Sequence, residues 1–159
     1  MLRPLLEIPV GLYTHLVQDL AVSGRGVKEA GAFLLGTTAG AARKVKSYLM
    51  YDVIAPKSSS EHDYVVLTGE EMAAAWDHCY RVGLEVVADV HTHPMEPGQS
   101  VYDRAHPMVS VAGHVALILP WFAMREPMPI DLGVHVFHGS SRWTSMFGDA
   151  AQSAIALTD

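Results

Sequence analysis

Apolar residues alternate along the chain with short connections that contain glycine or proline. In the first third, apolar residues at helical spacing predict a helix over Ile8 to Ala21, which Ser23-Gly24 would end. An apolar run over Gly31 to Gly36 predicts a buried strand, and a second strand is expected over Arg43 to Ile54. The small residues between these strands favour a hairpin connection.

The middle of the chain predicts a longer helix followed by a strand. Thr68 is a candidate N-cap for a helix that ends near Val82, with acidic residues in its first turn. A valine-rich strand over Glu85 to His91 follows, and a short helix is expected from Ser100 to about Ala105.

The last third predicts three further strands, over 115–119, 130–138 and 142–147. Trp121 to Pro129 reads as an irregular insertion, and the weakly patterned Ala150 to Asp159 as a frayed tail. Because hairpin connections dominate, the order of elements predicts one α+β domain over residues 1–159. Its mixed, largely antiparallel sheet would be flanked by helices.

Composition narrows the functional classes. Half of the 159 residues are apolar and 18% are charged, which is typical of a globular chain. The net charge of −6 argues against binding to nucleic acid or to an anionic membrane. A single cysteine, Cys79, fits a reducing compartment, and Met1 to Val10 lacks the apolar core of a signal peptide. We therefore expect a cytoplasmic protein.

Candidate chemistry is concentrated in His91-Thr92-His93-Pro94 and the following Ser100-Val101-Tyr102-Asp103. Side chains alternate along a strand, so His91 and His93 would point the same way at its end. Asp103 adds a carboxylate. Two histidines and one carboxylate leave the fourth tetrahedral position open for water, as in catalytic zinc sites. The sequence therefore predicts one zinc ion held by His91, His93 and Asp103.

Simpler explanations exist for the separate parts of this pattern. Ser100 and Asp103 also fit a variant of the helix capping box, which is compatible with a metal site because it places Asp103 on the first turn. We interpret His135 and His138 as strand-surface residues, and His114 as either a satisfied polar group or a neighbour of the site.

The full set of residues resembles the signature of the JAMM/MPN+ metallopeptidases. The similar positions are Glu29 with Gly36, then His91-Thr92-His93-Pro94, then Ser100-Val101-Tyr102-Asp103. Six residues separate His93 from Ser100, where family members usually have seven. The resemblance extends over roughly residues 26–147 and is strongest to small bacterial members. It implies an MPN, or cytidine-deaminase-like, architecture.

The resemblance also implies a mechanism. Zinc would be bound by His91, His93 and Asp103. Glu29 would act as the proton carrier rather than as a ligand, and the Ser100 hydroxyl would help to hold the oxyanion. The implied reaction is hydrolysis of a peptide or isopeptide bond after the C-terminal glycine of a ubiquitin-like protein.

The same resemblance implies partners. Some small bacterial members accompany activating-like and conjugating-like proteins, which are therefore candidate partners here. The insertion that carries Trp121, Phe122 and Met124 stands where family members contact substrate. An apolar contact with a protein partner is expected there.

Two other functions stay open. The chain could be a catalytically silent MPN-like scaffold that only binds partners, although the complete residue set argues against this. It could also apply the same zinc chemistry to a small amide or a sulfur-carrier conjugate. An amidohydrolase barrel needs about 250 residues, so this chain is too short for one.

Overall fold

The protein, seen in a computed structural model that describes residues 3–56 and 66–159, is built on one eight-stranded sheet. The strand order is β7-β6-β5-β4-β2-β3-β1-β8. Four strand pairs are antiparallel (β2–β3, β2–β4, β5–β6 and β6–β7) and three are parallel. The strands are β1 (Leu6–Pro9), β2 (Gly31–Ala39), β3 (Ala42–Met50), β4 (Glu85–Thr92), β5 (Val115–Leu119), β6 (Gly133–Gly139), β7 (Arg142–Met146) and β8 (Ile155–Thr158). The expected combination of helices with a mixed sheet is confirmed.

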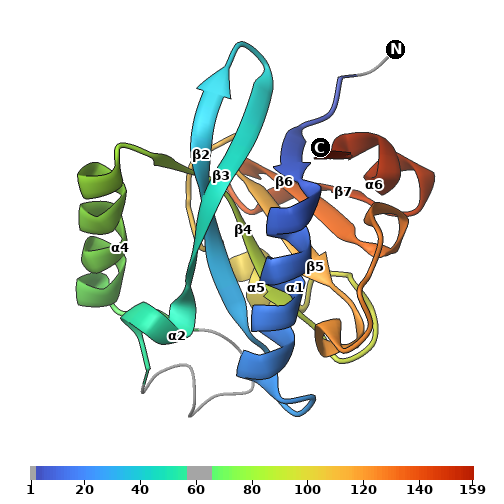
Figure 1. The fold of residues 1–159 in the computed structure, drawn as a ribbon, viewed down its shortest axis with the longest axis horizontal. Coiled ribbons are helices and arrows are strands. Elements are labelled where there is room, and N and C mark those ends of the chain that lie inside the picture. Colours follow the sequence, from blue (N-terminus) through green and yellow to red (C-terminus); the bar gives the residue numbers. More distant parts are fainter. Residues whose placement is uncertain (1–2, 57–65) are drawn as a thin grey trace.

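Helices cover both faces of the sheet. The long helix α1 (Val10–Gly24) crosses one face in Figure 1, and α5 (Val101–Ala105) lies behind the sheet. The α1 side chains Leu16 and Leu20 join a core with Leu34 of β2. The next residue along β2, Leu35, points to the opposite face and packs with Cys79 of α4 (Gly69–Val82). This alternation in β2 separates two apolar cores, as the pleat of a strand requires.

The C-terminal segment corrects one prediction. Ala150 to Asp159 is not a frayed tail, because it forms α6 (Asp149–Ala154) and strand β8. Strand β8 pairs in parallel with β1, in the register Leu6 with Ile155, and Ile155 is buried. The pattern for this pairing is weak in both strands, since β1 has only four residues and its Ile8 fits the apolar spacing of the helix that follows.

Other element boundaries also differ from the sequence predictions. The strand expected over Arg43 to Ile54 ends at Met50 and continues as the single turn α2 (Tyr51–Ile54). The strand expected from Ile130 begins at Gly133, after the 3-10 turn η2 (Pro129–Asp131). The irregular insertion contains a second such turn, η1 (Trp121–Ala123), whose three residues all have positive φ.

The fold places β4 at the centre of the sheet and brings its C-terminal end beside the start of β2.

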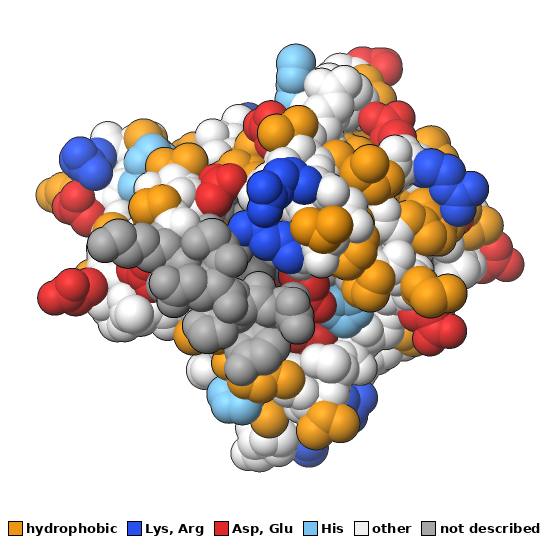
Figure 2. All heavy atoms as spheres, turned by 90° about the horizontal axis from the view of Figure 1, so that it is seen from below, with side chains coloured by type: hydrophobic (Ala, Val, Ile, Leu, Met, Phe, Trp, Pro, Cys, Tyr) orange, Lys and Arg blue, Asp and Glu red, His pale blue; other side chains and the backbone are white. Residues whose placement is uncertain are grey.

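Within the described residues, no helix is both long enough and apolar enough to cross a membrane. On the face seen in Figure 2, hydrophobic side chains are scattered among acidic and basic ones.

Candidate metal centre

The end of β4 presents two imidazoles on one side, as the strand alternation predicts. The Nε2 atoms of His91 and His93 are 3.1 Å apart. The extended backbone continues past Thr92, because the His93 amide donates to the Leu119 carbonyl of β5. Thr92 points the other way and is fully buried. The sheet itself therefore fixes the relative placement of the two rings.

Glu29 reaches the same point from the segment that precedes β2. The amide of Ala30 donates to Thr92 Oγ1 at 3.0 Å, and the Thr92 amide donates back to the Ala30 carbonyl at 2.9 Å. These two bonds place Glu29 beside the histidines, with its Oε1 3.1 Å from His93 Nε2. The three side chains of Glu29, His91 and His93 form a group whose potential ligand atoms all lie within 4.8 Å of one another.

Asp103 comes to this group on the first turn of α5. The expected capping box is confirmed: Ser100 Oγ accepts from the Asp103 amide, and Asp103 Oδ2 accepts from the Ser100 amide at 2.9 Å. The same Oδ2 lies 3.4 Å from His91 Nε2 and 3.1 Å from His93 Nε2. Asp103 therefore caps the helix and lies beside both imidazoles at the same time.

These distances fit a single divalent ion. Zinc bonds to nitrogen or oxygen of about 2.0–2.1 Å in a tetrahedron put neighbouring ligand atoms roughly 3.3 Å apart. Four of the six separations run from 3.1 to 3.4 Å, namely those of His93 from His91, Glu29 and Asp103, and that of His91 from Asp103. Two neutral imidazoles and two carboxylates are also donors that zinc accepts. The residues present fit zinc, and both carboxylates lie within reach of the ring nitrogens.

Interactions between Asp103 and the two histidines shift the pKa values of His91 and Asp103 toward their charged forms. Burial alone lowers the pKa of His91, but the hydrogen bond and charge of Asp103 outweigh it, and the pKa is raised above its ordinary value. For Asp103, burial works to raise the pKa, yet the hydrogen bonds from His91 and His93 hold it well below its usual range. Asp103 is therefore ionised at neutral pH, as a metal ligand must be.

A buried hydrogen-bonded pair of polar side chains lies next to the histidines. Asp89, two residues before His91 on β4, accepts from His114 at 2.6 Å, and both side chains are almost fully buried. This identifies His114 as a satisfied polar group. Asp89 was not identified from the sequence. Its signal is an acidic residue within a valine-rich strand, at the same alternation as His91 and His93.

His135 corrects another prediction, because this side chain is fully buried rather than on the strand surface. Its ring contacts the Pro97 carbonyl at 3.0 Å and Ser145 Oγ at 2.7 Å. The loop between His93 and Ser100 therefore covers a sheet position that the strand pattern alone assigned to solvent. His138, three residues further along β6, is exposed as expected.

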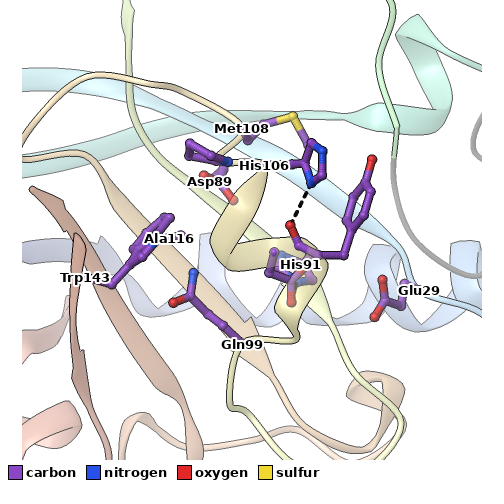
Figure 3. Close-up of a pocket in the computed structure, with 11 residues that line it drawn as sticks. Glu29, Asp89, His91, Gln99, His106, Met108, Ala116 and Trp143 are labelled. Carbon is purple, nitrogen blue, oxygen red and sulfur yellow. Dashed lines mark hydrogen bonds and ion pairs between the residues drawn. The ribbon is translucent and has the colours of Figure 1, made fainter. Parts of the chain in front are cut away.

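Two hollows adjoin the cluster. Figure 3 shows the first, with Glu29 and Trp143 on opposite sides of it and His91 between them. The second is more open and runs along the loop that joins the two parts of the motif. It is lined by His93, Pro94, Met95, Glu96, Gly98, Gln99 and Ser100.

The residues expected to contact substrate lie in and just after η1. The amide of Phe122 donates to the His93 carbonyl at 2.8 Å, which ties this segment to the second histidine. The Trp121 ring lies under the Arg125 guanidinium, 4.1 Å from its carbon, and Met124 is largely exposed. The segment is therefore adjacent to the site, and a contact with substrate stays a prediction.

Comparisons with known proteins inform the fold. No protein-family model matches the sequence. The chain is similar to a protein from Desulfitobacterium hafniense with a TM-score of 0.68 and 15% identity, over 97% of this chain and 93% of that one. It is also similar to a protein from Salinibacter ruber with a TM-score of 0.62 and 21% identity, over 96% and 92%. At these identities the likeness shows a shared fold and nothing about activity.

Proposed function

We propose that this chain is a zinc-dependent peptidase or isopeptidase of the JAMM/MPN+ type, with the MPN, or cytidine-deaminase-like, architecture. The observation that carries the proposal is the convergence of Glu29, His91, His93 and Asp103 from three separate segments. His93 Nε2 lies 3.1 Å from a polar atom of each of the other three residues, and Asp103 Oδ2 lies 3.4 Å from His91 Nε2. A structural role alone does not require four ionisable groups to meet at one partly open point.

In this proposal His91, His93 and Asp103 would hold the zinc ion, which would supply a Lewis acid and make water a nucleophile at neutral pH. Glu29 would take the proton from the attacking water and pass it to the leaving amine. Its side chain is 15% exposed and lies against His93, so it is close to the centre and still reachable by substrate. Its neighbours keep it in place through the Ala30–Thr92 bonds.

Ser100 is proposed to stabilise the oxyanion by donating a hydrogen bond from its hydroxyl group. Its Oγ accepts from the Asp103 amide, which leaves the hydroxyl proton available for donation. Ser100 is exposed and lines the open hollow beside His93. A hydroxyl at this position can donate to the developing negative charge on the scissile carbonyl oxygen.

The proposed substrate is the C-terminal tail of a ubiquitin-like protein, cut after its last glycine. An extended tail can lie in the open hollow that runs from His93 to Ser100. Trp121, Phe122 and Met124 would contact the folded part of the substrate, since their segment is bonded to His93. Activating-like and conjugating-like enzymes are proposed as pathway partners in the cytoplasm, with no role for nucleic acid or a membrane surface.

The test incubates zinc-loaded protein with fusions of candidate ubiquitin-like proteins and maps the products by intact mass. We expect a cut directly after the terminal glycine that a chelator abolishes. Cleavage that resists the chelator would contradict the zinc mechanism. A protein that binds zinc and cuts no fusion would favour a small amide or sulfur-carrier substrate, and one that binds no zinc would favour a silent scaffold.

A further inference from the structure

The hairpin of β6 and β7 contacts the segment that carries Asp103 at two points. On β6, His135 bonds to the Pro97 carbonyl in the loop that leads to Ser100. On β7, Trp143 Nε1 donates to the Arg104 carbonyl at 3.1 Å, immediately after Asp103. The two contacts lie on either side of the capping box. Both atoms that accept are backbone carbonyls, so the hairpin holds the course of the chain rather than particular side chains.

The polarity of the His135 contacts is determined by its partners. A carbonyl oxygen only accepts, so Nε2 of His135 carries the hydrogen that Pro97 receives. Nδ1 then accepts from the Ser145 hydroxyl. Burial lowers the pKa of His135, although the bond to Pro97 opposes this. The ring is therefore neutral, with both nitrogens in use, and it faces the loop in one fixed orientation.

Gly133 provides the space for this contact. A Cβ at that position would lie 1.9 Å from the Pro97 oxygen and 2.6 Å from His135 Nε2. Gly133 pairs with Ile118, which in turn pairs with His91, so the three residues form one row across the sheet. The loop thus reaches the sheet in the same row as the first histidine ligand, at a residue without a side chain.

We propose that His135 and Trp143 are positioning residues that hold Asp103 at the metal centre. This inference rests on the proposed function, because it assumes that His91, His93 and Asp103 bind zinc. Helix α5 has only five residues, too few to be stable without tertiary contacts. The imidazoles need no such support, since β4 is hydrogen-bonded on both sides. The two hairpin contacts supply it for the carboxylate.

The experiment compares four variants of the full chain with the wild type. His135→Leu removes the donor, His135→Gln keeps an N–H near the Nε2 position, and Trp143→Phe removes the indole N–H while keeping an aromatic ring. His138→Ala is the matched control, because this exposed histidine on the same strand bonds to Thr144 instead. The readouts are the zinc dissociation constant from chelator competition, the visible spectrum of the cobalt-loaded protein, and the midpoint of thermal unfolding without metal.

We expect His135→Leu to weaken zinc binding by on the order of 10-fold, which is typical when a group that orients a ligand is lost. Trp143→Phe should weaken it by a smaller factor, and both should alter the cobalt spectrum. His135→Gln should recover most of the affinity, and His138→Ala should match the wild type. A purely structural role would lower the unfolding midpoint of the variants without changing the zinc affinity of the folded protein.

Unchanged zinc affinity and cobalt spectra in folded His135→Leu and Trp143→Phe would overturn this inference and leave the proposed function intact. If His135→Leu does not fold, Trp143→Phe decides alone, by the same criterion. A wild type that binds no zinc would overturn both the inference and the proposed function. The affinity of the wild type thus separates the two failures.

Discussion

The candidate centre has two halves that are built in different ways. His91, His93 and Glu29 are fixed by the sheet, through the β4 pairings and the Ala30–Thr92 bonds. Asp103 and Ser100 stand on a five-residue helix after a loop, and their placement depends on a capping box and on contacts from β6 and β7. One half is therefore preorganised by backbone hydrogen bonds of the sheet, whereas the other is assembled from side-chain contacts.

The largest effect should come from the sheet-borne half. His91→Ala removes one of the two imidazole ligands, so we expect the zinc content to fall from one ion per chain to almost none. Elemental analysis of the purified variant measures this directly. Full zinc occupancy in His91→Ala would mean that the ligand set is wrongly assigned.

The next largest effect distinguishes the role of Glu29 from that of Asp103. Glu29→Gln should keep its zinc and lose turnover by about 10²–10⁴-fold, because only the proton carrier is removed. Asp103→Asn should lose both. Zinc content and cleavage rate, measured on the same samples, give the comparison. Parallel loss of metal and activity in Glu29→Gln would instead identify Glu29 as a ligand, which its distance of 3.1 Å from His93 also allows.

Ser100 tests the helix-borne half. Ser100→Ala removes the cap acceptor and the proposed oxyanion donor, so turnover should fall by about 10²-fold. The free energy of unfolding should fall by about 1 kcal/mol. Ser100→Thr keeps the hydroxyl and is the matched control for both. A stability loss without a change in kcat would leave Ser100 as a cap only.

Thr92 tests the sheet-borne half in the same way. Thr92→Val keeps the shape and removes Oγ1, which leaves the Ala30 amide without its 3.0 Å acceptor. A buried donor left unsatisfied costs about 1–3 kcal/mol, so denaturant unfolding should show a loss in that range. Alanine at Glu70, an exposed residue in α4, is a suitable control. No loss in Thr92→Val would argue that the two bonds do not hold the Glu29 segment.

The smallest effect concerns pH. The pKa of His91 is raised in the folded protein, chiefly by Asp103 against the effect of burial. Its contribution to stability without metal is therefore present below about pH 6.5, the ordinary value, and is lost as the pH rises through the raised pKa. Zinc competes with that proton, so its affinity should rise over the same window. The stability of the metal-free protein should therefore fall with pH while the zinc affinity rises. If both quantities changed in the same direction, this linkage would be contradicted.

The sequence predicted the local geometry within each half well and the long-range contacts poorly. Alternation along β4 fixes how His91 and His93 point, and the spacing of Ser100 and Asp103 fixes the capping box, so both are local. The location of Glu29 beside them depends on the β2–β4 register, which the sequence reached only through a family resemblance. The burial of His135 depends on a loop folding over another strand, which no local pattern records.

The same distinction explains the fold predictions. Elements with strong local signals, such as α4 with its Thr68 cap and the apolar β5, agree closely with their predicted limits. The pairing of β1 with β8 joins the two ends of the chain, and its strands have only four residues each. Long-range pairing of short strands leaves little local pattern, so the sequence of residues 150–159 predicts a tail where the structure has a helix and a strand.

X-ray absorption of the zinc-loaded protein would show directly which atoms bind the metal. We expect a four-coordinate ion with two imidazole ligands and the remaining ligands oxygen, at about 2.0–2.1 Å. The only cysteine, Cys79, is buried against β2 on the apolar side of α4, so no sulfur ligand is expected. A spectrum without imidazole scattering, or with a sulfur ligand near 2.3 Å, would rule out a zinc site built from His91 and His93.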